Sequence, residues 1–339
     1  MTEPRENPVL VEVYRNNVIE SCHRGSVLVV DHYGKTIFSL GDVTRDVYPR
    51  SSIKLFQTLP LVESGAADYF NLTDQEIALA CASHNAESIH VETVLSWLKK
   101  IDLDVESLEN GPDLPLSKHA KYELLKSGGQ PGKVHQNCSG KHTGMLTMAK
   151  YLGVSTKGYS EHDHPTQRNW MKSFSELIDI DVAQLPWERD GCGLPAICMS
   201  LERLAYGCAL FANPKNLSNS KQSAIKRILN SIANHPLMIA GSNRFCTEII
   251  EKTKGEIFVK TGAEGVFAGV VPSAGVGIAL KIDDGATRGS EVAMGAVLNK
   301  LGFIDDEMQS KLIQQLSPKI FNSQGNQTGR IVPSDVWEI

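Results

Sequence analysis

The sequence predicts an α+β fold, in which the first and last segments form an antiparallel sheet and the middle of the chain is mainly helical. Short β-branched runs bounded by turn residues occur near both ends of the chain. Between them, apolar residues recur at helical spacing, with capping residues and glycine stops. We expect one unit over residues 1–339, with a sheet region at 1–65 and 245–339 and a helical region at 66–244.

The expected strands alternate with turns rich in glycine and proline. They cover residues 9–13, 26–30, 36–40, 256–260, 265–271 and 275–282. Gly34 stands between two of these runs and indicates a hairpin. Pro49 ends the first group of strands, because proline fixes φ and restricts the residue before it.

Apolar residues at helical spacing predict the helices, and some of them end directly before glycine, as at Gly65 and Gly153. They cover residues 51–64, 77–82, 88–100, 118–126, 139–152, 165–178, 195–211, 218–233, 289–301 and 306–316. Thr73 and Glu76 form a capping box before the second helix. Pro60 is expected to kink or shorten the first one. The last two helices are expected to close the chain.

Composition points to a cytoplasmic protein that acts on small molecules. With 339 residues and 41% hydrophobic residues, the chain can bury a substantial core. The net charge of −5, with both signs interspersed, argues against nucleic acid as a partner. Residues 1–8 lack the apolar core of a secretory signal, and no apolar run is long enough to span a membrane. Seven scattered cysteines suit a reducing compartment.

A candidate nucleophile lies where the first strands give way to helix. Ser51 and Lys54 are three residues apart, so on a helix their Cβ atoms would lie roughly 5–6 Å apart on one face. A desolvated amine can remove the proton of a serine hydroxyl, and Arg50 adds like charge nearby. The alternative is an exposed lysine on a helix surface, since this spacing also arises by chance.

Two further motifs follow Ser-x-x-Lys along the chain, and the order of the three is informative. Ser83 and Asn85 form a Ser-x-Asn motif after a helix, and Lys260 begins a Lys-Thr-Gly motif at the end of a strand. With Ser-x-x-Lys, this is the motif set of penicillin-binding proteins and class A β-lactamases. The alternatives are a helix cap for Ser83, a turn residue for Asn85 and a surface strand end for Lys260.

Each group has a role in acyl transfer. Ser51 would attack a carbonyl, Lys54 would take its proton, and Ser83 would relay a proton to the leaving group. Lys260 would keep Lys54 deprotonated and hold a substrate carboxylate, and a backbone amide within 261–263 would join that of Ser51 in an oxyanion hole. Either lysine remains a candidate base, because two close amines titrate as a pair.

Two cysteine segments in the helical region suggest part of a zinc site. Cys138 is followed by Lys141 and His142, and Cys192 follows Asp190 in a glycine-bracketed segment. The spacing matches no standard four-ligand finger, and buried cysteine at helix starts is the alternative. His162 and His164 precede a proline and are interpreted as a loop and a helix cap.

Taken together, these segments resemble the Rhizobium etli type of L-asparaginase, in the asparaginase II family. The resemblance covers nearly the whole chain in the right order and is carried by the segments 48–51, 81–85, 137–142, 190–195 and 260–265. It implies a serine β-lactamase/DD-peptidase-like fold, a homodimer, and hydrolysis of L-asparagine to aspartate and ammonia through Ser51.

The resemblance also implies roles for individual residues. The catalytic group would be Arg50, Ser51, Lys54, Ser83 and Lys260. Zinc would be bound by Cys138, Lys141 and Cys192, and substrate by His142, Asp190, Asn85 and Glu264. Lysine is an unusual zinc ligand because it must be neutral to bind. The metal would position substrate or stabilise the fold, since Ser51 already supplies the nucleophile.

Three other functions compete with this hypothesis. One is a serine-dependent glutaminase, because asparagine and glutamine differ by one methylene. Another is a hydrolase that interacts with β-lactams, although the absence of a signal peptide argues against it. The last is a non-catalytic binding protein stabilised by zinc, in which the Ser-Lys pair is incidental.

Overall fold

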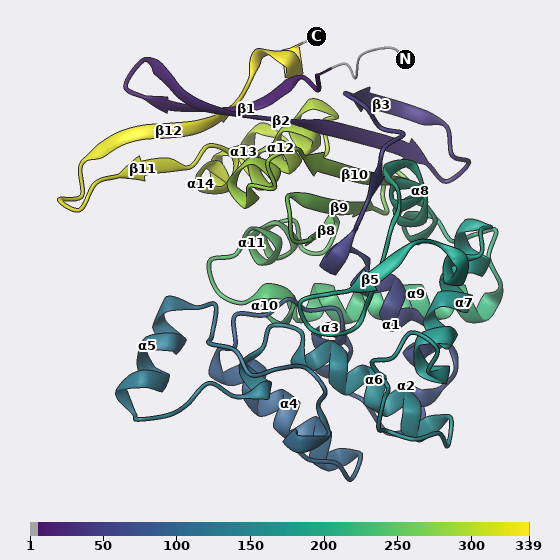
Figure 1. Cartoon of the computed structure of the whole chain (residues 1–339). Coiled ribbons are helices and arrows are strands. Elements are labelled where there is room, and N and C mark those ends of the chain that lie inside the picture. The colour runs from purple at the N-terminus through teal and green to yellow at the C-terminus, as the bar shows by residue number, and fades with distance from the viewer. Residues whose placement is uncertain (1–5, 339) are drawn as a thin grey trace. The chain divides into compact units, whose positions relative to one another are not determined.

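The computed structural model describes residues 6–338. Residues 1–5 and 339 lie outside the described residues. The prediction that the N-terminal segment is not a secretory signal falls partly on residues 1–5. The chain forms two compact units (Figure 1). The sheet unit contains the described residues up to Ser52, Cys198–Asn213 and the residues from Lys252 onward, and the helical unit contains Ile53–Ile197 and Pro214–Glu251.

The sheet unit is built on one antiparallel sheet. Its strands are β1 (Val9–Arg15), β2 (Val18–Asp31), β3 (Thr36–Leu40), β8 (Phe258–Thr261), β9 (Val266–Val271), β10 (Val276–Ile282), β11 (Lys319–Phe321) and β12 (Gln327–Pro333). They pair in the order β11-β12-β1-β2-β10-β9-β8, and β3 pairs with β2. The predicted α+β class, with a sheet from both ends of the chain, is confirmed.

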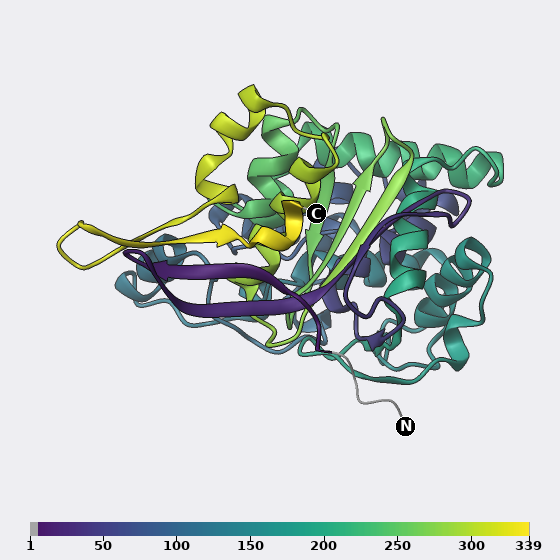
Figure 2. The ribbon, with the colours of Figure 1, turned by 90° about the horizontal axis from the view of Figure 1, so that it is seen from above.

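Helices pack on the sheet within this unit. They are α8 (Leu201–Ala212), α12 (Thr287–Lys300), α13 (Asp306–Lys311) and α14 (Ile313–Leu316). Figure 2 shows α8 and α12 on different sides of the strands, and both contact β10. At Gly277 the approach is very close, since an added Cβ would lie 2.2 Å from the Ala205 carbonyl oxygen. Glycine there lets α8 lie directly on the strand.

The six predicted strands are all present, but the sheet has two more at its edge. The hairpin of β2 and β3 turns at Gly34, whose φ is +81°, and Asp31 accepts backbone hydrogen bonds from Tyr33 and Lys35. β11 and β12 were not predicted, and they follow the last α-helix, so the expected closing of the chain by two helices is wrong. β11 is only three residues long, and β12 is partly polar and ends in Pro333, which are weak strand signals.

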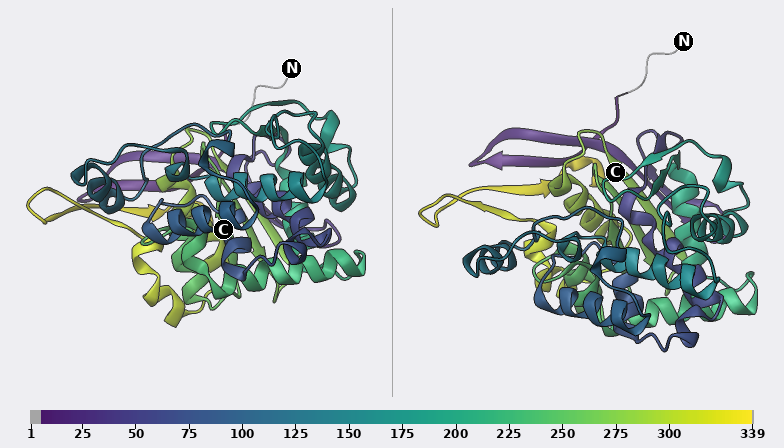
Figure 3. Two further views of the ribbon diagram at one scale, coloured as in Figure 1. Left: turned by 90° about the horizontal axis from the view of Figure 1, so that it is seen from below. Right: turned by 60° about the horizontal axis from the view of Figure 1, so that its bottom comes forward.

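The helical unit contains most of the remaining elements (Figure 3). They are α1 (Lys54–Glu63), α2 (Ala66–Tyr69), α3 (Asp74–Ala80), α4 (Ser88–Lys100), α5 (Lys118–Lys126), α6 (Ser139–Tyr151), α7 (Pro165–Ile178), α9 (Asn219–Asn234), α10 (Pro236–Ala240), α11 (Phe245–Lys252), β5 (Trp187–Arg189) and β6 (Pro195–Ile197). α11 ends with Lys252, the first residue of the last sheet-unit segment. No helix in the described part of the chain is long and apolar enough to cross a bilayer.

Helix α6 lies at the centre of this unit. It contacts α1, α3, α4 and α7, and its residues Ser139 to Ala149 are all buried. An added Cβ at Gly140 would lie 2.5 Å from the Leu79 carbonyl oxygen, so this glycine lets α6 approach the end of α3. The segments that follow α3 and precede α6 are thereby held side by side.

Short 3₁₀ helices and strand pairs complete the fold. They are η1 (Arg50–Ile53), η2 (Val105–Ser107), η3 (Lys133–His135), η4 (Val182–Gln184), η5 (Asp335–Glu338), β4 (Asp46–Val47) and β7 (Met199–Ser200). The chain runs from η1 directly into α1, so the predicted helix over 51–64 begins with a tighter turn. Pro60 does not end α1, which continues to Glu63.

Two predicted helices are corrected by the structure. The helix expected over 195–211 begins only at Leu201, because Ser200 caps it by accepting a hydrogen bond from the Arg203 amide. Residues 195–197 instead form β6, since short apolar runs do not distinguish strand from helix. The helix expected over 306–316 is divided at Leu312 into α13 and α14.

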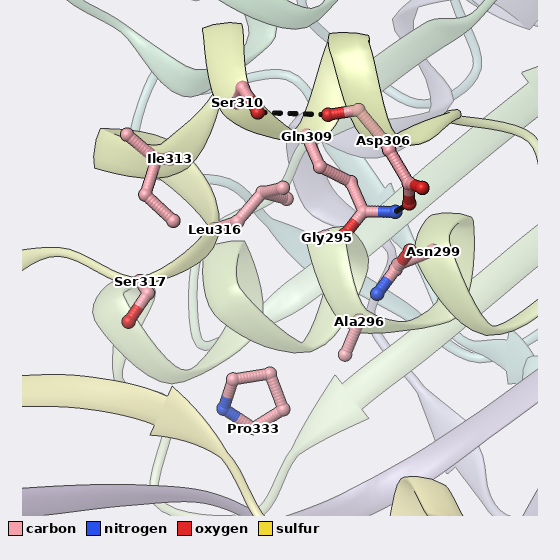
Figure 4. A pocket seen from close by; sticks show the side chains of 10 residues that line it. All are labelled: Gly295, Ala296, Asn299, Asp306, Gln309, Ser310, Ile313, Leu316, Ser317 and Pro333. Carbon is pink, nitrogen blue, oxygen red and sulfur yellow. Dashed lines mark hydrogen bonds between the residues drawn. The ribbon is translucent and has the colours of Figure 1, made fainter.

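A groove of about 620 Å³ lies in the sheet unit beside α12 (Figure 4). Its walls come from α12, α13, α14 and the end of β12. Ala296, Ile313, Leu316 and Pro333 give it a mainly apolar lining.

We expect Gly277→Ala to destabilise the protein. The new methyl group would meet the α8 backbone and force the helix away from β10, at a cost of about 1–3 kcal/mol or more in unfolding free energy. Chemical denaturation measures the change. Gly111→Ala is the matched control, because nothing lies within 4 Å of a Cβ there; equal stability of the two variants would contradict the packing argument.

Candidate active site

Lys54 is the first residue of α1 and is completely buried, with 0% of its surface exposed. Its amine donates hydrogen bonds to the Ala82 carbonyl oxygen, to Ser83 Oγ at 3.0 Å and to Cys138 Sγ at 3.0 Å. Lys54 is therefore not a surface lysine. The structure brings the Ser-x-x-Lys and Ser-x-Asn motifs together at this amine.

The surroundings of Lys54 favour its neutral form. Burial lowers the pKa of its amine, the charge of Lys141 lowers it further, and Cys138 acts in the opposite direction. A neutral amine has a lone pair that can accept a proton. The environment thus suits a general base.

The two cysteine segments also meet in the helical unit. Cys138 is the N-cap residue of α6, and Cys192 lies in the turn that joins β5 to β6. The turn is closed by a hydrogen bond from the Asp190 amide to the Leu194 carbonyl oxygen at 2.8 Å, and Gly193 adopts a φ of +92° that favours glycine. The two cysteine segments therefore lie together, as one shared site would require.

The thiols and Lys141 form a buried, charged cluster. Lys141 Nζ lies 3.3 Å from Cys192 Sγ. The hydrogen bond between the two thiols, and then burial, raise the pKa of Cys138 to about 12. The same bond, together with Lys141, holds the pKa of Cys192 well below its usual value. Burial lowers the pKa of Lys141, but the charges of Cys192, Cys138 and Asp190 outweigh it and raise the pKa overall.

The donor set of this cluster fits zinc chemically. Residues 6–338 contain no group of three His, Cys, Asp or Glu side chains arranged to hold a metal ion. Two sulfur donors and one nitrogen donor are nevertheless close together if Lys141 is counted. Zinc prefers sulfur and nitrogen ligands, and three protein ligands are typical of sites that keep an open position. Lys141 would have to lose its proton to bind.

His142 lies next to this cluster on α6. The residue is completely buried, and its Nδ1 is 2.6 Å from the hydroxyl of Tyr159. Burial, and then the charge of Lys141, lower the pKa of His142 to about 3. Tyr159 was not predicted as a site residue, because nothing in its local sequence pattern marks it.

Asn85 and Asp190 are held by bonds to neighbouring groups. The Asn85 amide donates to the Ser242 carbonyl oxygen at 3.2 Å and to Glu87 Oε1 at 3.2 Å, and its oxygen accepts from Arg244 at 2.8 Å. Asp190 Oδ1 accepts from the Gly191 amide at 2.6 Å. Their predicted substrate contacts stay predictions, and Asn85 has a structural role as well.

His162 and His164 have the local roles expected from the sequence. The His164 ring accepts a hydrogen bond from the Thr166 amide and caps α7. The His162 ring stacks on Trp187, with ring centroids 4.2 Å apart. The interpretation as a loop and a cap is confirmed.

The sheet unit holds Ser51 beside the Lys-Thr-Gly motif. Ser51 is half-buried, whereas Ser52 is only 1% exposed and donates its hydroxyl to the Pro49 carbonyl oxygen at 2.7 Å. An added Cβ at Gly262 would lie 2.4 Å from that same oxygen and 3.4 Å from the Ser52 amide nitrogen. Glycine therefore lets the end of β8 approach the turn that carries Ser51.

The remaining predicted residues of this unit occupy unusual positions. Arg50 has a positive φ of 53°, in a region that residues other than glycine rarely adopt. Lys260 is 2% exposed, which excludes a surface strand end, and its amine donates to the Thr261 carbonyl oxygen at 3.0 Å. Glu264 is exposed, also with a positive φ, of 58°.

Comparison with solved structures gives remote similarity over most of the chain. A protein described as Mglu in its native form is 13% identical, with a TM-score of 0.45, and the match covers 84% of this chain and 67% of that one. A β-lactamase from Mycobacterium bovis is 12% identical, with a TM-score of 0.41, covering 81% and 94%. A putative β-lactamase from Bacteroides dorei DSM 17855 is 12% identical, with a TM-score of 0.39, covering 76% and 84%.

Comparison with curated protein sequences found no significant match. The predicted homodimer and zinc ion stay predictions. The family model described as L-asparaginase II matches residues 11–333, nearly the whole sequence. The chain therefore belongs to the L-asparaginase II family, which implies an asparaginase of the hydrolase class.

Proposed function

We propose that the protein hydrolyses the side-chain amide of L-asparagine to aspartate and ammonia through an acyl-enzyme on Ser51. The observation that carries the proposal is the buried amine of Lys54, bonded to Ser83 Oγ at 3.0 Å and three residues along the chain from the half-buried Ser51. Membership of the L-asparaginase II family supports asparagine as the substrate.

In the proposed first step, Ser51 Oγ attacks the amide carbonyl carbon and its proton passes to Lys54 Nζ. The carbon–nitrogen bond of the resulting tetrahedral intermediate then breaks. The leaving nitrogen takes the proton from Lys54 through the Ser83 hydroxyl and departs as ammonia. The hydrogen bond between Lys54 and Ser83 supports this relay, because it joins the two groups that exchange the proton.

In the second step, water attacks the ester carbonyl of the acyl-enzyme. A base removes a proton from the water, the bond to Ser51 Oγ breaks, and Ser51 recovers its proton as aspartate leaves. Lys54 performs both proton transfers in this scheme. Lys260 is the alternative base, and we assign it instead to the substrate carboxylate on the strength of the Lys-Thr-Gly motif.

The Lys-Thr-Gly segment also supplies a candidate for the oxyanion hole. The Gly262 amide already donates to the Val266 carbonyl oxygen at 2.7 Å. A neighbouring amide, such as that of Ala263, would then join the Ser51 amide in stabilising the oxyanion. The close approach of Gly262 to the Ser51 turn supports this assignment.

We further propose that Cys138, Lys141 and Cys192 hold a zinc ion. Bound zinc would supply a fixed positive charge that can polarise or orient a substrate oxygen. The side chains around it are buried and would hold the site rigidly. The nucleophile remains Ser51.

We expect Ser51→Ala to lower asparagine turnover at least about 1,000-fold while leaving the fold intact, because it removes the attacking oxygen. Ammonia release and circular dichroism measure the two effects. Ser52→Ala is the matched control: it removes only the hydroxyl bonded to Pro49, so we expect near-normal turnover. Normal ammonia release from Ser51→Ala would refute the proposal.

Lys54→Met should lower kcat at least about 100-fold, because the proton acceptor is lost. Lys221→Met is a control of the same type, since Lys221 is also buried but pairs with Glu63 and Glu176, each at 2.8 Å. We expect that variant to lose stability and keep its kcat. High activity in Lys54→Met would move the base role to another residue.

The purified protein should contain zinc, and Cys192→Ala should lose it, because the substitution removes a sulfur ligand. Metal analysis tests this, with Cys208→Ala as the control, since Cys208 is buried in the other unit. Chelation should raise KM for asparagine if the ion positions substrate. Absence of zinc from the unaltered protein would contradict the assignment.

Parallel assays decide among the competing functions. Ammonia release from asparagine should exceed that from glutamine, although one methylene changes binding by only about 1–3 kcal/mol. A chromogenic β-lactam should be turned over slowly or not at all. Bound zinc without amidase activity in the unaltered protein would favour the non-catalytic binding protein.

A further inference from the structure

One ring nitrogen of His142 is buried without a hydrogen-bond partner. Within the described residues, Nε2 has no hydrogen-bond partner, although the residue is 0% exposed. A buried polar atom left in this state costs free energy, so it normally finds a partner in a ligand or a water molecule. His142 belongs to the same buried turn of α6 as Lys141.

The other nitrogen of His142 is held by Tyr159. The Tyr159 hydroxyl lies 2.6 Å from Nδ1, and the two rings are nearly perpendicular, at 76°. The same hydroxyl oxygen accepts a hydrogen bond from the Glu109 amide at 2.9 Å. The Tyr159 hydroxyl oxygen therefore already accepts one hydrogen bond, and its own proton is available to donate to His142 Nδ1.

Tyr159 is fixed in place from several sides. The Glu109 carboxylate accepts hydrogen bonds from the amides of Gly158 and of Ser160, the latter at 2.9 Å. Gln167 on α7 donates to the Tyr159 carbonyl oxygen at 2.7 Å. Glu109 thus binds the tyrosine segment through its own amide and its carboxylate, which leaves the hydroxyl little freedom to move.

This arrangement selects one tautomer of His142. If Nδ1 carried a proton, it would donate to Tyr159, and the tyrosine O–H would have no acceptor. If Nδ1 is unprotonated, it accepts the tyrosine proton and the neutral ring carries its hydrogen on Nε2. In the first state, both the tyrosine O–H and His142 Nε2 would lack a partner. In the second state, only Nε2 lacks one.

We propose that Tyr159 is a positioning residue that holds His142 in the neutral Nε2–H tautomer, so that Nε2 donates a hydrogen bond to an oxygen of the bound substrate. The substrate identity rests on the function proposed above. In this state Nε2 cannot bind a metal, because its lone pair is occupied by the proton. His142 therefore acts as a hydrogen-bond donor beside the predicted zinc ligands.

Nitrogen-15 NMR of the histidine rings tests the tautomer without any assay of activity. The His142 signals are assigned by their loss in His142→Gln. We expect a protonated Nε2 and an unprotonated Nδ1 in the unaltered protein, and a mixture of tautomers in Tyr159→Phe. Addition of L-aspartate should shift the Nε2 signal of the unaltered protein. A protonated Nδ1 in the unaltered protein would overturn the inference.

Kinetics provide the second measurement. Tyr159→Phe should lower kcat/KM for asparagine about 10- to 100-fold, mainly through a higher KM, because an orienting partner is lost. Tyr151→Phe is the matched control, since it also removes one hydroxyl hydrogen bond, to the Ser64 carbonyl oxygen at 2.7 Å. Equal kcat/KM in Tyr159→Phe and the control would overturn the inference.

The two measurements separate this inference from the proposed function. A protonated Nδ1 in an active asparaginase refutes the role of Tyr159 and leaves the proposed function intact. The expected tautomer and the L-aspartate shift, in a protein that does not release ammonia from asparagine, refute the proposed function and uphold the donor role of His142.

Discussion

The amines of Lys54 and Lys141 are buried at the candidate site in the helical unit, and most features around the site serve to accommodate them. An isolated ammonium group in an apolar interior is very unfavourable unless it is paired or loses its proton. Lys54 is bonded to a carbonyl, a hydroxyl and a thiol, and Lys141 lies beside Cys192. The two lysines meet this constraint differently, since burial lowers the pKa of Lys54 while nearby negative charge raises that of Lys141.

Lys221, in the same unit, shows how a buried lysine with a purely structural role is stabilised. Its amine is paired with two carboxylates, and these bonds raise its pKa. Within the described residues, the Lys54 amine bonds a carbonyl, a hydroxyl and a thiol rather than a carboxylate. A carboxylate would stabilise a charged amine far better than a hydroxyl or a carbonyl. The contrast indicates that the surroundings of Lys54 favour proton exchange over a permanent charge.

Local sequence patterns predicted most helices and strands well. They could not predict contacts between residues far apart in the sequence. The Thr73 capping box and the limits of α5 follow from short patterns that act within one turn. β12 escaped prediction because its polar, glycine-containing sequence becomes a strand only by pairing with β1. In the site, the motifs indicated Ser51, Lys54 and Ser83, but no pattern indicated that Tyr159 would orient His142, since that contact depends on how two distant segments pack.

The pairing of β1 with β12 has a consequence for the order of folding. Val13 lies opposite Ile331, so the sheet joins segments separated by almost the whole chain. Long-range contacts of this kind form slowly, because a large loop must close before any bond is gained. During synthesis the helical unit is complete once Glu251 has emerged, but β1 must wait for β12, which is made later. Until then one side of β1 is an unpaired strand edge, open to other chains.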